Sequence, residues 1–159
     1  MLGTALVQLT MPGVPDVYQG TEAEYRALVD PDNRRAVGFP PEESGGTSGE
    51  KAAVTRATLG LRGRRPGAFG DTATYAPLTA EGPAAAHCAA FVRSGEVVTA
   101  VTRLSLRLAE AGGWRDTRLP LPPGRWADVL QPGREFTGHA RVEELFAGLP
   151  VALLERVGD

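Results

Sequence analysis

Polar side chains able to hold a polar ligand gather in one stretch near the start of the chain. One group lies at the end of a short apolar run, residues 14–19, and the other lies within the string D-P-D-N-R-R that ends at Arg35. Carboxylate and amide oxygens accept hydrogen bonds, and a guanidinium donates them from a fixed fork. The candidate binding residues are Tyr18, Gln19, Glu22, Asp30, Asp32, Asn33 and Arg34.

A purely structural interpretation of this stretch is also open. Asp-Pro-Asp-Asn is equally a pair of Asx turns that organise their own backbone. Arg34 is then simply the ion-pair partner of Asp30 or Asp32. Residue types and spacing alone do not choose between a binding loop and a self-contained turn.

The elements that position these residues can be inferred from apolar spacing. Leu2, Ala5, Leu6 and Leu9 recur at helical spacing, and Pro12 disfavours a helix at the residue before it, which predicts a first helix ending near there. A short strand is expected over residues 14–19, and about 25 residues without a regular period come after it.

A second helix is expected over residues 48–63. Thr47 and Glu50 have the T-x-x-E spacing of a capping box, and Gly63 and Pro66 mark the end of the helix. The apolar stripe that it buries is Val54, Ala57, Thr58 and Leu61. Strand, polar loop and helix form the βα unit of α/β enzymes, which bind substrates at the carboxyl ends of their strands.

From Gly70 onward the pattern changes to short alternating runs separated by turn residues. Ser94-Gly95 predicts a tight hairpin, and Gln131-Pro-Gly-Arg134 predicts a type II turn. The expected fold is an antiparallel sandwich or meander of about six to eight strands. Strands are predicted at 74–78, 87–93, 97–103, 117–121, 125–130, near Phe136 and at 151–157.

Composition limits the partners. The 159 residues carry 17 Lys and Arg against 19 Asp and Glu, so a formal charge of −2 offers no field for nucleic acid or an anionic membrane. Cys88 is the only cysteine and requires no oxidising compartment, and no signal peptide or membrane span is visible, which favours the cytoplasm. The helical stripe already runs at Leu2 without a cap, so we expect the chain to be the C-terminal part of something longer.

The remaining chemically active side chains are interpreted as structural. His87 and His139 have no cysteine or carboxylate at metal-ligand spacing, so neither a metal nor a cofactor is expected. Cys88 lies in a strand run and is expected to be a small buried apolar group. Trp114 and Trp126 are expected to pack in the core, with a sugar-stacking platform as the alternative.

The sequence also resembles a known family. P-G-V-P-D-V-Y-Q-G-T-E at residues 12–22, together with L-V-D-P-D-N-R-R at 28–35, is similar to the maltooligosyl trehalose synthase family of the α-amylase clan, glycoside hydrolase family 13. The resemblance continues through residues 59–69, 80–83 and 149–154. It covers nearly all of this chain but only the last part of such an enzyme.

The resemblance implies a fold in two parts. Residues 1–69 are expected to be the end of a (β/α)8 catalytic barrel: the end of helix seven, strand eight, a loop and helix eight. Residues 70–159 are expected to be a C-terminal β-sandwich. A lone βα unit lacks neighbouring barrel strands, so residues 1–69 are expected to be more sensitive to protease than the remainder.

The resemblance also implies a reaction. The reducing-end α-1,4 bond of a maltooligosaccharide is broken, a covalent glycosyl-enzyme forms, and the released glucose is rejoined through its anomeric oxygen as an α,α-1,1 unit. Retention requires two carboxyl groups about 5–5.5 Å apart. In such families these groups lie on earlier barrel strands, so we assign no catalytic residue here, and the missing N-terminal barrel portion is the expected partner.

The chain departs from the family pattern in one loop, and two other functions are open. The family reads R-R-P-V-D where this chain has Arg34-Arg-Ala-Val-Gly38, so a proline and a carboxylate are absent from the loop. One alternative is a non-catalytic module whose sandwich binds α-glucan or is purely structural. Another is a different member of the clan, such as an α-amylase or a trehalohydrolase.

Overall fold

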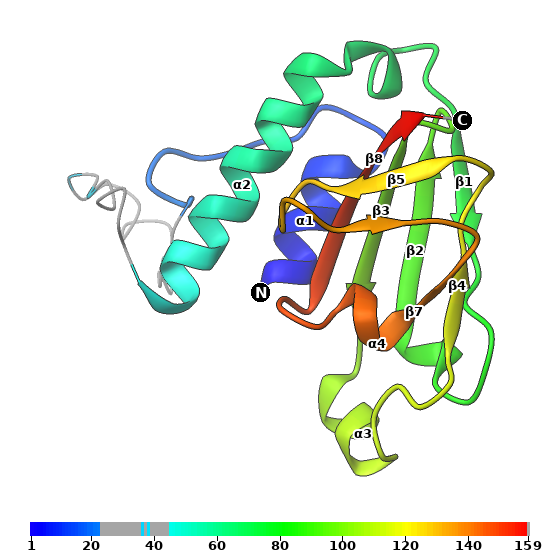
Figure 1. Cartoon of the computed structure of the whole chain (residues 1–159). Coiled ribbons are helices and arrows are strands. Elements are labelled where there is room, and N and C mark those ends of the chain that lie inside the picture. Colours follow the sequence, from blue (N-terminus) through cyan, green and yellow to red (C-terminus); the bar gives the residue numbers. More distant parts are fainter. Residues whose placement is uncertain (23–35, 37, 39–44, 159) are drawn as a thin grey trace.

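The centre of the computed structural model is an antiparallel six-stranded sheet, with a two-stranded sheet beside it (Figure 1). The structure describes residues 1–22, 36, 38 and 45–158. In spatial order the large sheet contains β1 (Tyr75–Leu78), β2 (Cys88–Arg93), β3 (Val97–Thr102), β8 (Val151–Gly158), β5 (Arg125–Asp128) and β6 (Glu135–Phe136). The small sheet pairs β4 (Arg118–Pro120) with β7 (His139–Arg141).

Helices flank the strands. α1 (Leu2–Thr10) packs against α2 (Gly46–Arg64) on one side and against β3 and β8 on the other. Figure 1 shows α2 projecting from the sheet beside α1, and α4 close to β7. The shorter helices are η2 (Pro66–Ala68), η3 (Ala85–His87), α3 (Ser105–Glu110) and α4 (Val142–Leu145).

Apolar side chains on both faces of the sheet explain why β3 and β8 lie at its centre. Successive side chains of a strand point to opposite faces. In β8, Val151 and Leu153 join one core while Ala152 and Leu154 join the other, and all four are fully buried. A strand buried on both faces needs a continuous apolar run of this kind.

The sheet therefore separates two hydrophobic cores. The helix-side core joins α1 and α2 to the sheet and consists of Leu2, Leu6, Val54, Leu61, Ala68, Phe69, Val97, Val101, Val151 and Leu153. The strand-side core consists of Ala80, Cys88, Ala90, Val92, Val98, Ala100, Leu119, Leu121, Trp126, Ala140, Val142, Leu145, Ala152 and Leu154. The helix-side core thus contains residues from both sides of the expected division at residue 69.

Several sequence-based predictions are confirmed. Every strand expected after Gly70 is present in the two antiparallel sheets, with small differences at the ends. Ser94 and Gly95 have φ of 49° and 66°, and Glu96 N–H donates to the Arg93 carbonyl at 2.9 Å, which closes the predicted hairpin. Gly133 has φ of 90°, the conformation that the third position of a type II turn requires.

Two local predictions are wrong, and one short strand was not predicted. Residues 14–18 do not form a strand, and the Val14 side chain is 96% exposed, because none of the described strands lies alongside to supply backbone partners. Thr47 does not cap α2: the N-cap is Gly45, without a side-chain hydrogen bond, and Thr47 lies inside the helix. The sequence does not predict β7, since three residues are too few for a clear alternating pattern.

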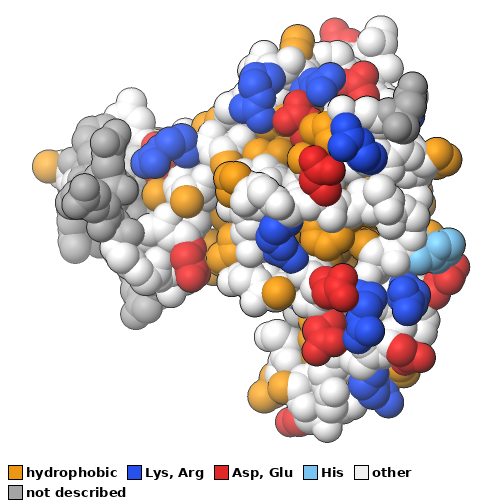
Figure 2. Space-filling model, viewed as in Figure 1, with side chains coloured by type: hydrophobic (Ala, Val, Ile, Leu, Met, Phe, Trp, Pro, Cys, Tyr) orange, Lys and Arg blue, Asp and Glu red, His pale blue; other side chains and the backbone are white. Residues whose placement is uncertain are grey.

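The surface carries both signs of charge. On the face shown in Figure 2, Lys and Arg side chains alternate with Asp and Glu over the β region, and apolar side chains are scattered between them. Within the described ranges, no helix combines the length and apolar character that a membrane span requires.

Candidate functional site

The predicted polar site is described in part. Tyr18, Gln19 and Glu22 lie in the segment between α1 and α2, whereas Asp30, Asp32, Asn33 and Arg34 lie outside the described residues. The Tyr18 carbonyl accepts hydrogen bonds from the N–H and the Oγ1 of Thr21, at 3.1 and 2.6 Å. This turn leaves the Tyr18 side chain 56% exposed, so its ring is available to a ligand.

Glu22 is the one described candidate with a buried polar atom. Its Oε2 is buried and accepts no hydrogen bond in the described part of the chain. A buried carboxylate oxygen without a donor is energetically costly, so such an atom usually has a partner in the working protein. A hydroxyl group of a ligand or of another segment of the protein would supply the hydrogen bond that this oxygen lacks.

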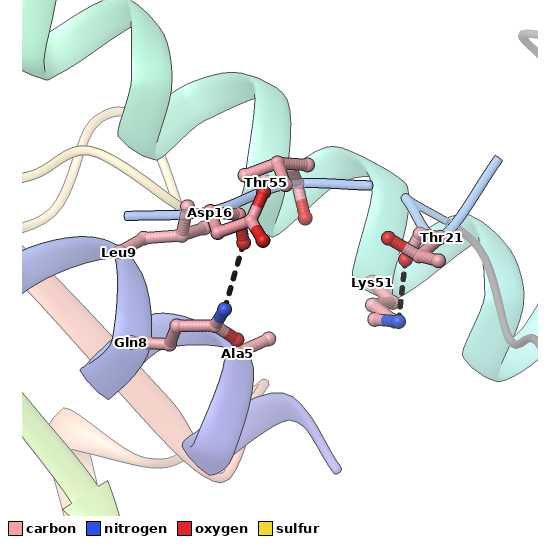
Figure 3. A pocket seen from close by; sticks show the side chains of 8 residues that line it. Ala5, Gln8, Leu9, Asp16, Thr21, Lys51 and Thr55 are labelled. Atoms are coloured by element: carbon pink, nitrogen blue, oxygen red, sulfur yellow. Dashed lines mark hydrogen bonds between the residues drawn. The ribbon is translucent and has the colours of Figure 1, made fainter. Parts of the chain in front are cut away.

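Hydrogen bonds from both long helices hold the segment that carries these residues (Figure 3). From α1, Gln8 Nε2 donates to the Asp16 carbonyl at 2.8 Å. From α2, Lys51 Nζ donates to the Thr21 carbonyl. Sequence reasoning missed Gln8 and Lys51, because a contact between a side chain and a distant carbonyl leaves no local pattern.

A small hollow lies between the segment and the two helices. Its volume is about 70 Å³, and Asp16, Thr21, Lys51 and Thr55 are among its lining residues (Figure 3). This space holds a few water molecules at most. The hollow is therefore only the narrow gap that remains where the segment packs against α1 and α2. A sugar ring bound near Tyr18 has to lie outside it.

The described carboxylates with shifted pKa values serve the structure. Burial raises the pKa of Asp128, although its carboxylate accepts backbone hydrogen bonds from Leu130 and Gln131. Burial also acts to raise the pKa of Glu155, but hydrogen bonds from Arg65 and Arg64 outweigh it, and the net pKa is lowered. Neither arrangement pairs an acid with a base beside a ligand-sized space, so neither supports catalysis.

The predictions for the cysteine and the tryptophans can be checked directly. Cys88 is buried, and burial raises the pKa of its thiol to about 12, so it is not a nucleophile at neutral pH. Trp126 is fully buried, and its Nε1 donates to the Pro122 carbonyl at 2.9 Å, which excludes it as a sugar platform. Trp114 packs against Phe146, with 5.3 Å between ring centroids.

The two histidines lie in separate places. His87 ends η3, where its Nδ1 lies 3.2 Å from the Arg103 carbonyl, and His139 begins β7. Among the described residues, no three His, Cys, Asp or Glu side chains come together at metal-binding distance.

The chain was compared with protein-family models, with curated proteins and with solved structures. No protein-family model matches the chain. The putative maltooligosyl trehalose synthase of Mycobacterium tuberculosis is 46% identical over 157 residues, which are 98% of this chain and 20% of that protein. The structure of maltooligosyltrehalose synthase from Arthrobacter ramosus superposes with a TM-score of 0.87 at 44% identity, again over 98% of this chain. The chain is similar to a C-terminal portion of maltooligosyl trehalose synthase.

The match covers nearly all of this chain but a small part of each relative. The chain spans about a fifth of the length of the synthases that it matches. A further structure, described as maltooligosyl trehalose synthase, shares the fold at 24% identity with a TM-score of 0.65. The resemblance inferred from residues 12–22 and 28–35 is thus confirmed over almost the whole chain.

Proposed function

We propose that this chain supplies the C-terminal part of a maltooligosyl trehalose synthase. The whole enzyme would convert the reducing-end α-1,4 linkage of a maltooligosaccharide into an α,α-1,1 linkage by retaining intramolecular transglucosylation. The observation that carries this proposal is the 46% identity over 98% of the chain, together with the TM-score of 0.87. Similarity at this level along the full chain supports a shared role as well as a shared fold.

In this proposal, residues 1–69 form the end of a (β/α)8 barrel and residues 70–159 form the C-terminal β domain. α1 and α2 would then be barrel helices seven and eight. The segment 14–19 would be the last barrel strand, which pairs with its neighbours only when the rest of the barrel is present. The 96% exposure of Val14 in this chain is consistent with this proposal, because its pairing partners would come from earlier barrel strands.

The polar site is proposed to bind the maltooligosaccharide. It comprises Tyr18, Gln19, Glu22, Asp30, Asp32, Asn33 and Arg34. The exposed ring of Tyr18 offers a face to a sugar, and the unsatisfied Oε2 of Glu22 offers an acceptor to a hydroxyl. A loop over the reacting sugar also excludes water, which would otherwise hydrolyse the glycosyl-enzyme.

The catalytic carboxylates are proposed to lie on the remaining four fifths of the enzyme. The chain by itself is therefore expected to form no trehalose-ended product from maltopentaose. A cytoplasmic location fits this proposal, because the single buried thiol of Cys88 needs no oxidising compartment.

A hybrid enzyme tests the proposal. The corresponding portion of the Arthrobacter ramosus synthase is replaced by this chain, and maltopentaose is the substrate. We expect the hybrid to form maltooligosyl trehalose, and Asp32→Asn to lower kcat/KM by about 10- to 100-fold, the effect of losing one charge-assisted hydrogen bond. Asp116→Asn, at an exposed acid of the β domain, is the matched control and is expected to keep full activity. A folded hybrid without activity would contradict the proposal.

A further inference from the structure

A second hollow lies on the helix side of the sheet, and none of Tyr18, Gln19 and Glu22 lines it. Its volume is about 240 Å³, just below the range of typical small-molecule pockets. Residues 12–14, Arg62, Phe69, Asp71 and Arg93 contribute to its lining. Two guanidinium groups therefore border one cavity, and neither belongs to the polar site around Tyr18.

The two arginines reach this place from different elements. Arg62 comes from the last turn of α2 and Arg93 from the end of β2. Both guanidinium carbons lie over the Phe69 ring, at 4.5 and 5.7 Å from its centroid. Cation–π contact of this kind holds the side chains in place and leaves the charge without a counter-ion.

Within the described part of the chain, their hydrogen bonds go only to neutral carbonyl groups. Arg62 Nη1 donates to the Leu9 carbonyl at 3.0 Å. Arg93 donates from Nη1 to the Thr10 carbonyl at 3.3 Å and from Nε to the Thr74 carbonyl at 3.2 Å. The Leu9 and Thr10 carbonyls lie at the C-terminal end of α1, where helix carbonyls lack partners within the helix. Nη2 of both arginines and Nε of Arg62 make no hydrogen bond among the described residues.

No carboxylate among the described residues neutralises the positive charge of the pair. Arg93 is only 2% exposed, and none of the ion pairs among the described residues joins it or Arg62 to a carboxylate. Asp71 lies at the exposed rim and forms no ion pair with either of them. Burial and the neighbouring Arg93 charge lower the pKa of Arg62, which reports the cost of placing two like charges together.

We propose that this hollow, the Arg62–Arg93 site, binds a small phosphate monoester. A phosphate monoester carries about −1.5 to −2 charges at neutral pH and so matches two guanidinium groups, whereas a carboxylate matches one. The unused guanidinium N–H groups suit phosphate oxygens, which arginine binds as a fork. The volume leaves room for a small organic group attached to the phosphate.

The test is a titration with glycerol 2-phosphate, inorganic phosphate and acetate, at constant ionic strength, monitored by heteronuclear NMR. It is run on the 159-residue chain and on the hybrid enzyme, so that binding is measured independently of synthase activity. We expect glycerol 2-phosphate to bind at least ten times more tightly than acetate, with shifts at Phe69 and Arg62. Arg62→Gln is expected to weaken binding at least tenfold, and Arg62→Lys to weaken it less.

The matched control is Arg56→Gln, which removes the same charge from an exposed position of α2 and is expected to change the affinity less than twofold. The proposal is overturned if neither protein binds phosphate, if Arg62→Gln binds as well as the wild type, or if acetate binds as tightly as glycerol 2-phosphate. In each of these cases the two arginines serve only to cap α1.

Discussion

The two faces of the central sheet are covered in different ways. The strand-side core is closed by β4, β7 and α4, all of which come from the same stretch of chain as the sheet. The helix-side core is closed by α1 and α2, which come from the first 64 residues. The strand-side face is thus covered by elements that are close to the sheet in the sequence. The helix-side face is covered by α1 and α2, which the sequence analysis places in a different domain.

Polar contacts reinforce this difference. On the helix side, arginine side chains link elements that are far apart in the sequence. Arg65 Nε lies 2.7 Å from Glu155 Oε1, and this ion pair joins the end of α2 to β8. On the strand side, the Trp126 indole and the Asp128 carboxylate bond to backbone close by in the sequence. The β region is therefore internally complete on one face, whereas its other face is stabilised by the preceding helices.

The largest expected effect comes from the strand-side core. Trp126→Ala removes a fully buried aromatic side chain and should lower the free energy of unfolding by about 3–5 kcal/mol, measured by urea denaturation. Leu106→Ala, at a side chain that is 73% exposed, is the control and should change the free energy by less than about 0.5 kcal/mol. Equal effects at the two sites would mean that this core does not dominate stability.

Leu6→Ala probes the helix-side core in the same way. Leu6 is fully buried between α1 and the sheet, so its truncation should cost about 2–4 kcal/mol. Hydrogen exchange should accelerate in α1 and α2 more than in β4 and β7, because the truncation loosens only the helix-covered face. Uniform acceleration throughout the chain would contradict this difference between the faces.

Glu155→Gln removes the charge that pairs with Arg64 and Arg65 and so weakens the link between α2 and β8. Because the partner arginines are partly exposed, the expected loss is about 1 kcal/mol at pH 7. The folded-state pKa of Glu155 is lowered, so its contribution is present above the unfolded pKa and is lost as the pH falls through the folded value. The wild type should therefore lose more stability than Glu155→Gln between about pH 5 and pH 3. Parallel pH curves would disprove the role of this ion pair.

Asp128→Asn should show the opposite sign with a smaller amplitude. The folded-state pKa of Asp128 is raised by burial, so its contribution is present below the unfolded pKa and is lost as the pH rises through the folded value. The wild type should gain stability relative to Asp128→Asn as the pH falls from about 7 to about 4, by about 1 kcal/mol or less. Equilibrium unfolding at several pH values measures this, and a relative loss would refute the assigned direction.

Much of the β region could be predicted from the sequence because its signals are local. Runs of apolar residues define β3 and β8, and Ser94-Gly95 fixes the hairpin through the backbone freedom of two residues. The predicted stripe of α1 is largely correct: Leu2, Leu6 and Leu9 are buried, and Ala5 is half-buried. Residues 14–19 failed as a strand because strand formation depends on a partner, which no local pattern reports.

The sites were less predictable. Tyr18, Gln19 and Glu22 were found through their place after an apolar run, and their role in binding remains a proposal. Sequence reasoning missed the Arg62–Arg93 site entirely. Its two guanidiniums come from positions far apart in the sequence and meet only because α1, α2 and β2 converge at Phe69. The arginines are visible in the sequence, but the ring that they share is a product of tertiary packing.

The core shared by the helices and the sheet also revises the expectation of a protease-sensitive N-terminal part. That expectation assumed that the apolar stripe of α1 has no neighbour, whereas Leu2 and Leu6 belong to the same helix-side core as Val101 and Val151. α1 should therefore resist proteolysis together with the sheet. Among the described residues, the exposed segment around Val14 is an expected cleavage site.

Native-state hydrogen exchange of the unmodified chain tests most directly whether one core unites the two parts. If it does, the central amides of α1 and of α2 will exchange with opening free energies within about 1 kcal/mol of those in β3 and β8. Exchange of the helices at opening free energies several kcal/mol lower, while β3 and β8 stay protected, would show that the helices are only loosely attached.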